Sequence, residues 1–144
     1  MPEAIKFREE VCGGEARIRD YCFNLARDGG QVIAKSLGTE RMQTAQDEMS
    51  QCCFTNVRLP LSFRKEDTPN LDAADGPKIV TWIMDRAMYD YNTWMPGKFY
   101  GGAIWIRLSA QIYLEIKDFE WAAGVLKALC ERAEKGEWRE QDST

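Results

Sequence analysis

The sequence predicts an α+β domain in which helices cover one face of a small antiparallel sheet. Apolar residues recur at three- and four-residue intervals over much of the chain, as in amphipathic helices, and shorter segments alternate like strands. The length of 144 residues suits one domain. Helices that pack on one face of a sheet bury the apolar residues of the helices and those of the strands together. The α+β class therefore agrees best with the two patterns. We expect the domain to span 1–136, followed by a flexible charged tail at 137–144.

The N-terminal third of the chain is expected to be mainly helical. Residues 2–12 predict a short helix, and 15–37 predict a long amphipathic helix that ends at Gly38. Gly29-Gly30 lies inside the long helix, where each glycine costs about 1 kcal/mol relative to alanine. We interpret this pair as a point of close approach by another backbone, or as a kink. Residues 39–51 are polar and predict a connection with a partial helical turn.

The rest of the chain combines strands and helices. Residues 52–61 alternate as a strand does, and Pro60 restricts this strand to an edge or an end. The elements that follow are a loop at 64–76, a helix at 77–89, a strand and turn at 92–102, a strand at 103–109 and a helix at 118–135. Asp118 is the expected N-cap of the last helix, and Gly136 is expected to end it.

Composition excludes several classes of function. The formal net charge is −4 and the isoelectric point is about 5.0, which disfavours nucleic acid as a partner. The sequence contains no membrane-length apolar run and no visible secretory signal, so we expect a cytoplasmic protein. It contains no histidine, so a Ser-His-Asp triad and histidine-ligated zinc are excluded for this chain alone.

Cysteines and glycines show no metal or phosphate signature. The five cysteines include no CxxC pair, and Cys12, Cys22 and Cys130 fall in apolar helical stripes, so we expect structural, reduced thiols and no metal. The loop acids match no EF-hand pattern. The paired glycines form neither GxGxxG nor a P-loop.

Arg107 is the strongest candidate for a functional residue. It lies in the middle of the 103–109 strand, where Ile104, Ile106 and Leu108 share one face and Trp105, Arg107 and Ser109 share the other. Its planar guanidinium suits bidentate capture of a carboxylate. Two structural readings compete: an internal pair with an aspartate or glutamate, and simple solvent exposure on an open sheet face.

Aromatic and hydroxyl residues near Arg107 in the sequence suggest a ligand cleft, although aromatic clusters are also typical of cores. The expected substrate-binding residues are Arg107, Trp105, Ser109, Phe99 and Trp94. The expected catalytic donors and acid–base groups are Arg107, Tyr100, Tyr113 and Lys98, with Asp72 or Asp75 as a loop carboxylate.

Several motifs together resemble one family over residues 3–134. The most specific motif is Tyr100-Gly101-Gly102-Ala103-Ile104-Trp105-Ile106-Arg107-Leu108-Ser109-Ala110-Gln111-Ile112-Tyr113, supported by Gly13-Gly14-Glu15, Leu37-Gly38-Thr39-Glu40 and Asn56-Val57-Arg58-Leu59-Pro60-Leu61. The pattern is similar to the C-terminal small domain of class V aminotransferase-like, pyridoxal-phosphate-dependent enzymes. Within them it is closest to the isopenicillin-N-epimerase-like and hercynylcysteine sulfoxide lyase-like branch.

The resemblance implies that Arg107 binds the α-carboxylate of an amino-acid substrate. It also implies that the residues which hold pyridoxal phosphate belong to a large domain that this sequence lacks, because none of its lysines matches the cofactor lysine. The chain alone is therefore expected to bind no cofactor.

Three hypotheses about function follow. The first is a stand-alone domain that binds a small, carboxylate-bearing molecule, or acts as a cofactor-free cyclase or isomerase in biosynthesis. The second is a partner or relic subunit of a pyridoxal-phosphate-dependent C–S lyase or epimerase, which supplies Arg107 to a separate large-domain chain. The third is a non-catalytic interaction module, and a homodimer is compatible with the first and third.

Overall fold

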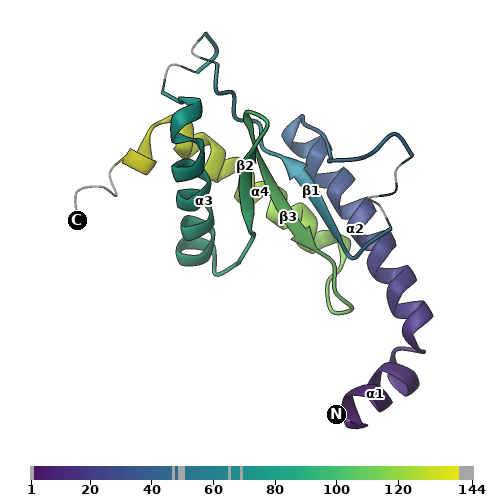
Figure 1. Cartoon of the computed structure of the whole chain (residues 1–144). Coiled ribbons are helices and arrows are strands. Elements are labelled where there is room, and N and C mark those ends of the chain that lie inside the picture. The colour runs from purple at the N-terminus through teal and green to yellow at the C-terminus, as the bar shows by residue number, and fades with distance from the viewer. Residues whose placement is uncertain (1, 47, 49–50, 65, 69, 140–144) are drawn as a thin grey trace.

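A three-stranded antiparallel sheet forms the centre of the domain in the computed structural model, which describes residues 2–46, 48, 51–64, 66–68 and 70–139 (Figure 1). The strands are β1 (Phe54–Arg58), β2 (Gly97–Tyr100) and β3 (Ala103–Ser109), in the order β1-β3-β2. The α-helices are α1 (Pro2–Lys6), α2 (Glu15–Leu37), α3 (Gly76–Tyr91) and α4 (Ile116–Glu134). The predicted α+β class is confirmed. No helix in the described ranges is long and apolar enough to cross a membrane.

The helices cover one face of the sheet and leave the other open. On β3, Ile104, Ile106 and Leu108 are buried toward the helices, as predicted, and Arg107 is exposed on the opposite face. Helices α2 and α4 pack on one another behind the sheet, with α3 beside β2 (Figure 1). Since β3 is central, its outward side chains lie in the middle of the open face.

The long helix α2 has the predicted bounds and the predicted end. Gly38 adopts a left-handed conformation with φ of 66°. Its backbone N–H donates to carbonyl oxygens of the last helical turn, those of Ala34 and Lys35. Gly29 and Gly30 are sites of close packing, but the groups that approach them are side chains rather than backbone. The Phe119 ring lies against Gly29, and Thr55 of β1 lies against Gly30. The glycine pair therefore brings α2 close to both α4 and the sheet.

Several predicted element bounds differ from the structure, among them those of α3, which covers Gly76–Tyr91 instead of the predicted 77–89. Strand β1 covers Phe54–Arg58 and is shorter than the predicted 52–61, although Leu59 N–H still bonds the Ile104 carbonyl oxygen at 2.9 Å. Helix α4 begins at Ile116, so the prediction that Asp118 is the N-cap was wrong. Glu115 is the N-cap, and Asp118 occupies the third helical position of a capping box.

The predicted N-terminal helix is an arm without buried residues. It continues from α1 into a π-helical turn, η1 (Phe7–Val11), and neither segment has a buried side chain. Arg8 pairs with Glu15 at the start of α2, and the arm projects from this N-terminal end of α2, away from the sheet (Figure 1). Its apolar residues therefore add nothing to the core.

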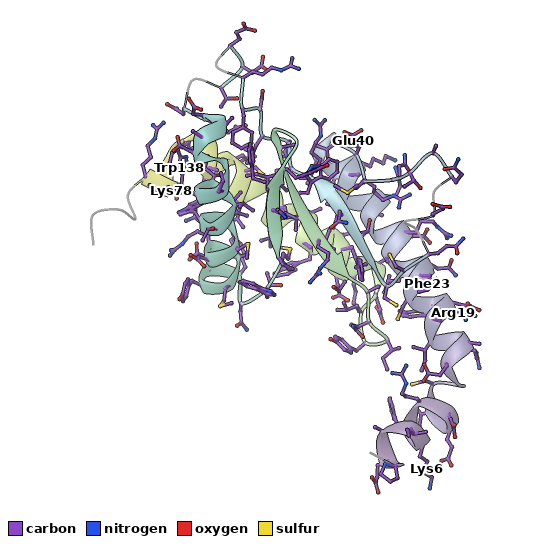
Figure 2. All side chains as sticks on the ribbon, viewed as in Figure 1. Lys6, Arg19, Phe23, Glu40, Lys78 and Trp138 are labelled. Carbon is purple, nitrogen blue, oxygen red and sulfur yellow. The ribbon has the colours of Figure 1, made fainter. Side chains whose placement is uncertain are left out.

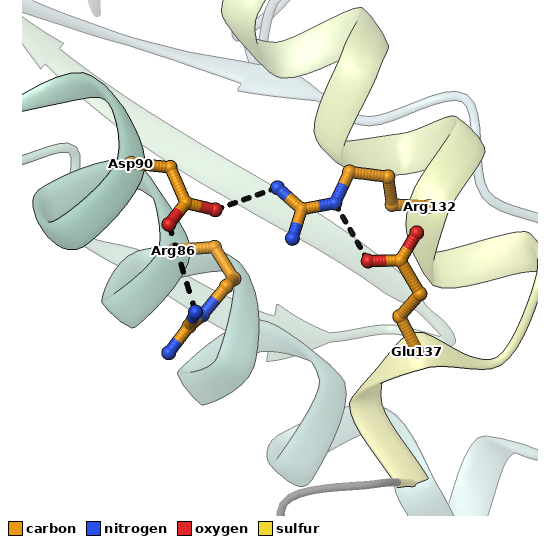
Figure 3. A network of polar contacts seen from close by, with 4 residues as sticks. All are labelled: Arg86, Asp90, Arg132 and Glu137. Atoms are coloured by element: carbon orange, nitrogen blue, oxygen red, sulfur yellow. Dashed lines mark hydrogen bonds and ion pairs between the residues drawn. The ribbon is translucent and has the colours of Figure 1, made fainter.

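The expected tail at 137–144 begins with residues that pack on the domain. Residues 137–139 form a 3₁₀ turn in which Trp138 is only 3% exposed. The Lys78 ammonium lies 5.4 Å from the centre of the Trp138 ring, and the two residues lie side by side (Figure 2). Arg132 of α4 binds Asp90 of α3 and Glu137 at 2.7 and 2.8 Å (Figure 3). Residues 137–139 thus belong to the packed domain, and 140–144 lie outside the described residues.

Candidate functional site

Arg107 is held by the sheet and exposes its guanidinium. Its backbone N–H donates to the Pro96 carbonyl oxygen at 2.8 Å, and Asn56 of β1 is its register partner. The guanidinium carbon lies 5.6 Å from the centre of the Phe54 ring. In the part of the chain that the structure describes, no carboxylate forms an ion pair with Arg107. Of the two structural readings, the structure therefore favours exposure on the open face over an internal ion pair.

A cleft of about 470 Å³ lies beside Arg107. Its walls come from the loop at 93–96 before β2 and from a continuous stretch that runs from the end of β3 through the following loop into the first turns of α4. We call this hollow the Arg107 cleft. It contains four of the predicted site residues: Trp94, Arg107, Ser109 and Tyr113.

A smaller hollow of about 240 Å³ lies on the other side of Arg107, over the open sheet face. Lys98 and Trp105 line it, together with Asn56 and Pro96. These two predicted residues pair across β2 and β3, so their side chains share the open face. Arg107 and Pro96 line both hollows, which makes Arg107 the common wall between them.

The remaining predicted residues lie outside both hollows. Phe99 points to the helix side of the sheet, where its ring packs edge-on against Phe63 at 4.9 Å and against Gly76. Tyr100 is on the open face but at the β2–β3 turn, 66% exposed and outside the cleft lining. The Asp72 carboxylate accepts a hydrogen bond from Ala74 N–H and caps a short 3₁₀ helix, η3 (Ala73–Asp75). Neither Asp72 nor Asp75 lines either hollow.

The prediction missed all four residues that line the Arg107 cleft from α4, of which Trp121 and Asp118 offer an exposed ring and a charge. Trp121 is 51% exposed and Asp118 is partly exposed, and they are three positions apart on the helix, so they are surface neighbours. Trp121 could have been recognised from the sequence, because it is a large aromatic residue that lies outside the apolar stripe of its amphipathic helix. Asp118 gave no such signal, because an acidic residue at a helix start is ordinary.

The charges of the cleft are few and oppositely signed. Its lining contains one guanidinium, Arg107, and one carboxylate, Asp118, and these two do not form an ion pair with each other. Asp118 Oδ2 accepts the Glu115 N–H at 2.7 Å, which fixes its orientation. Lys117 pairs with Glu115 at 2.7 Å, and the carboxylate hydrogen bond raises the pKa of the Lys117 ammonium. The chemistry that the cleft offers is therefore ionic recognition, with the Tyr113 hydroxyl as an additional donor.

The described residues do not fit the covalent attachment of pyridoxal phosphate. A lysine that reacts with the cofactor aldehyde is normally desolvated, which lowers its pKa. Every lysine in the described ranges is exposed, and Lys98 alone among them lines a hollow beside Arg107. The same ranges contain no cluster of three potential metal ligands, and the five cysteines are free thiols.

The fold and site define a small α+β domain with an exposed arginine at the centre of its open sheet face. Comparison with known proteins places it among lyase-related sequences, although no family model matches. The chain is 37% identical to the L-cysteine desulfhydrase-like protein lolT1 of Epichloe uncinata, over an alignment 145 residues long that covers 91% of the chain. It is 33% identical over 128 residues to the hercynylcysteine sulfoxide lyase of Schizosaccharomyces pombe.

The coverage of these relatives is partial. The chain spans 32% of the Epichloe protein and 28% of the Schizosaccharomyces protein, which is about a third of the relatives' length. The resemblance inferred from the motifs is confirmed: the chain is homologous to one segment of these proteins, in keeping with a small, C-terminal-type domain.

Proposed function

We propose that this domain binds a small molecule through its carboxylate, with Arg107 as the anchoring residue and the Arg107 cleft as the binding site. One observation carries the proposal: the exposed Arg107 guanidinium lines two adjoining hollows and has no carboxylate partner among the described residues. A guanidinium on a central strand is an oriented donor, and its fork matches a carboxylate in two parallel hydrogen bonds.

The cleft also supplies groups that fit a cofactor-free reaction on the bound molecule. The Tyr113 hydroxyl lines the cleft, and Lys98 lines the hollow on the other side of Arg107. Holding a flexible ligand by its carboxylate against an aromatic wall reduces its conformational freedom, which favours cyclisation or isomerisation. In this proposal Arg107 orients the ligand and the Tyr113 hydroxyl is the acid–base group beside it, within a cytoplasmic biosynthetic protein.

The experiment that tests this proposal compares an acid with its amide. 4-Methylpentanoate and 4-methylpentanamide are titrated into the protein, and binding is followed by calorimetry and by indole fluorescence. We expect the acid to bind and the amide to bind at least about tenfold more weakly, since charged hydrogen bonds contribute about 1.5–3 kcal/mol. Arg107→Ala should remove this preference, and Arg107→Lys should recover part of it.

Arg58 provides a matched control for Arg107. It is also an arginine of the sheet, on β1, but it pairs with Glu40 at 3.3 Å and does not line the cleft. Arg58→Ala should leave acid binding unchanged. Equal affinity for the acid and the amide, or full acid binding by the Arg107→Ala variant, would exclude the proposed function.

The partial coverage of the relatives favours a second candidate, in which the domain works with a separate chain that supplies the rest of their length. In that case Arg107 would serve a site completed by the partner. Co-elution of the two chains, with turnover only after mixing, would support this candidate. A homodimer or a non-catalytic interaction module is tested by size-exclusion chromatography over a dilution series, combined with the acid titration.

A further inference from the structure

We propose that Cys22 of α2 and Cys53, the residue before β1, are a redox pair that a small-molecule disulfide converts into an intramolecular disulfide. Both residues are free thiols in the structure. The bond would join α2 to the sheet and close a loop of about 30 residues. The pair lies on the side of the sheet that faces the helices, so the inference stands whether or not Arg107 binds a ligand.

The backbone directs the Cys53 side chain toward α2. Thr55, two positions further along β1, lies against Gly30 of α2. Alternate residues of an extended strand share a face, so Cys53 points to the helix side as Thr55 does, and it packs against the core. The Cys53 carbonyl oxygen accepts the Ala110 N–H at 2.7 Å, which continues the pairing of β1 with β3 and holds Cys53 in place.

Helix α2 presents Cys22 to the same region. Cys22, Ala26 and Gly30 recur every four residues and are all buried, so they form one stripe on the face of α2 that packs on β1 (Figure 1). The Cys22 thiol is hydrogen-bonded to the Cys53 thiol. The two sulfur atoms are therefore already neighbours, and side-chain rotation has only to bring them to the S–S bond length of about 2.0 Å.

The two thiols differ in access, and this difference assigns their roles. Cys53 is partly exposed, whereas Cys22 is only 3% exposed. Burial and the neighbouring Cys53 thiol raise the pKa of Cys22, while the Arg8 guanidinium acts in the opposite direction. Cys53 is therefore the residue that an oxidant reaches first, and Cys22 reacts with the sulfur atom beside it.

The reaction is a thiol–disulfide exchange, with glutathione disulfide as the oxidant. The Cys53 thiolate attacks one sulfur atom of glutathione disulfide, the S–S bond breaks, and one glutathione thiolate leaves. Cys22 then gives up its proton, and its sulfur attacks the Cys53 sulfur and displaces the second glutathione. The protein loses two protons and two electrons, and glutathione disulfide becomes two glutathione molecules. The raised pKa of Cys22 slows the second step, and the contact between the thiols offsets this because it makes the step intramolecular.

Two other cysteines are poor partners for Cys53. Cys52 is adjacent to it, and consecutive Cα atoms are about 3.8 Å apart, which is shorter than the usual spacing of about 4.4–6.8 Å across a disulfide. The Cys52 thiol instead donates to the Phe54 carbonyl oxygen at 3.0 Å. Cys130 is buried on α4, and burial raises the pKa of its thiol. Cys52 therefore serves as the exposed control and Cys130 as the buried one.

The test oxidises the full chain in native buffer with glutathione disulfide, alkylates the remaining thiols and maps the peptides by mass spectrometry without reduction. We expect one intramolecular cross-link, between Cys22 and Cys53. It should raise the Tm by about 5–10 °C, because it restricts the unfolded chain, and dithiothreitol should reverse this shift. Cys52→Ala and Cys130→Ala should form the same cross-link.

Single variants test the roles of the two thiols. In Cys22→Ala the resolving thiol is missing, so glutathione should remain attached to Cys53 as a mixed disulfide. In Cys53→Ala the buried Cys22 should stay unmodified, because no exposed thiol precedes it in the exchange. Cys53→Ala changes a partly exposed position, so it keeps the test decisive if Cys22→Ala does not fold. Circular dichroism checks the fold of both variants.

Several outcomes would overturn the inference. It fails if the native chain forms no Cys22–Cys53 cross-link, or if this cross-link forms only in urea. It fails equally if Cys22 pairs with Cys12 or Cys52, or if a folded Cys53→Ala variant is oxidised at Cys22 as fast as the wild type. None of these outcomes bears on acid binding at Arg107, so the proposed function is tested separately.

Discussion

The ring of Phe119 packs directly against Gly29, so closely that a methyl group at Gly29 would overlap Phe119 Cδ1. This contact joins α2 to the first turns of α4. Phe119 also lines the Arg107 cleft, so the packing of these helices and the shape of the cleft are coupled through one side chain.

Gly29→Ala should therefore destabilise the domain, even though alanine is the better helix former. We expect a loss of about 1–3 kcal/mol, because an added methyl group in a filled core forces its neighbours to move. Gly124→Ala is the control: Gly124 is in the interior of α4 with nothing near its Cβ position, so this change should stabilise by about 0.5–1 kcal/mol. Urea unfolding measures both, and equal stability of the two variants would contradict the packing argument.

The elements with strong apolar periodicity could be predicted from the sequence because their burial follows from the pattern itself. The bounds of α2 and β3 were predicted as the structure has them. Phe99 and Tyr100 were both expected at a cleft, but adjacent strand residues point to opposite faces, so only one of them can share a face with Arg107.

The composition of the cleft could not be predicted in full, because tertiary packing assembles it. Trp94, Arg107 and Trp121 belong to three different elements and line one cleft only after α4 packs behind the sheet. Asp118 indicated a helix start in the sequence, and this prediction was correct to within two residues. Nothing in the local sequence indicated that the Asp118 carboxylate would line a cleft with Arg107.

Arg132 should be the most important charged residue for stability. It bonds Asp90 and Glu137 at once, and its side chain is 28% exposed. Arg132→Met should lower the free energy of unfolding by about 1–3 kcal/mol, because two carboxylates lose a charged partner in a partly buried setting. Arg19→Met is the control, since Arg19 is 60% exposed beside Asp20, and it should change stability by less than about 0.5 kcal/mol. Similar thermal melting of both variants would contradict this assignment.

Stability should fall in alkaline solution partly because of Cys130. Burial, followed by Glu134 and Glu131, raises the pKa of this thiol far above its ordinary value. Above about pH 9 the unfolded chain loses the thiol proton while the folded chain keeps it, so rising pH favours unfolding.

Cys130→Ala isolates this contribution. Relative to the variant, the wild type should lose up to about 1.4 kcal/mol of unfolding free energy per pH unit above pH 9. Cys52→Ala, at a partly exposed position before β1, should leave the wild-type pH dependence in place. Parallel stability curves for wild type and Cys130→Ala between pH 8 and 10 would show that this thiol does not contribute.

The chain alone should form no stoichiometric covalent adduct with pyridoxal phosphate. Its described lysines are exposed and lack the desolvation that favours such an adduct. Absorbance titration, borohydride reduction and peptide mapping should show only scattered, partial labelling of surface lysines. One lysine labelled to completion would contradict this expectation.

Arg107→Ala should change ligand binding without changing stability. The sequence left two structural readings of this residue open, and they differ in energy. A buried internal ion pair would cost about 3–5 kcal/mol when broken, which is a large part of a typical stability of about 5–15 kcal/mol. The structure instead shows an exposed guanidinium over the Phe54 ring, with no carboxylate partner in the described ranges. We therefore expect a change of less than about 0.5 kcal/mol in urea unfolding, together with the loss of 4-methylpentanoate binding. A large fall in stability would assign Arg107 to the fold, and unchanged stability with unchanged binding would remove it from the site.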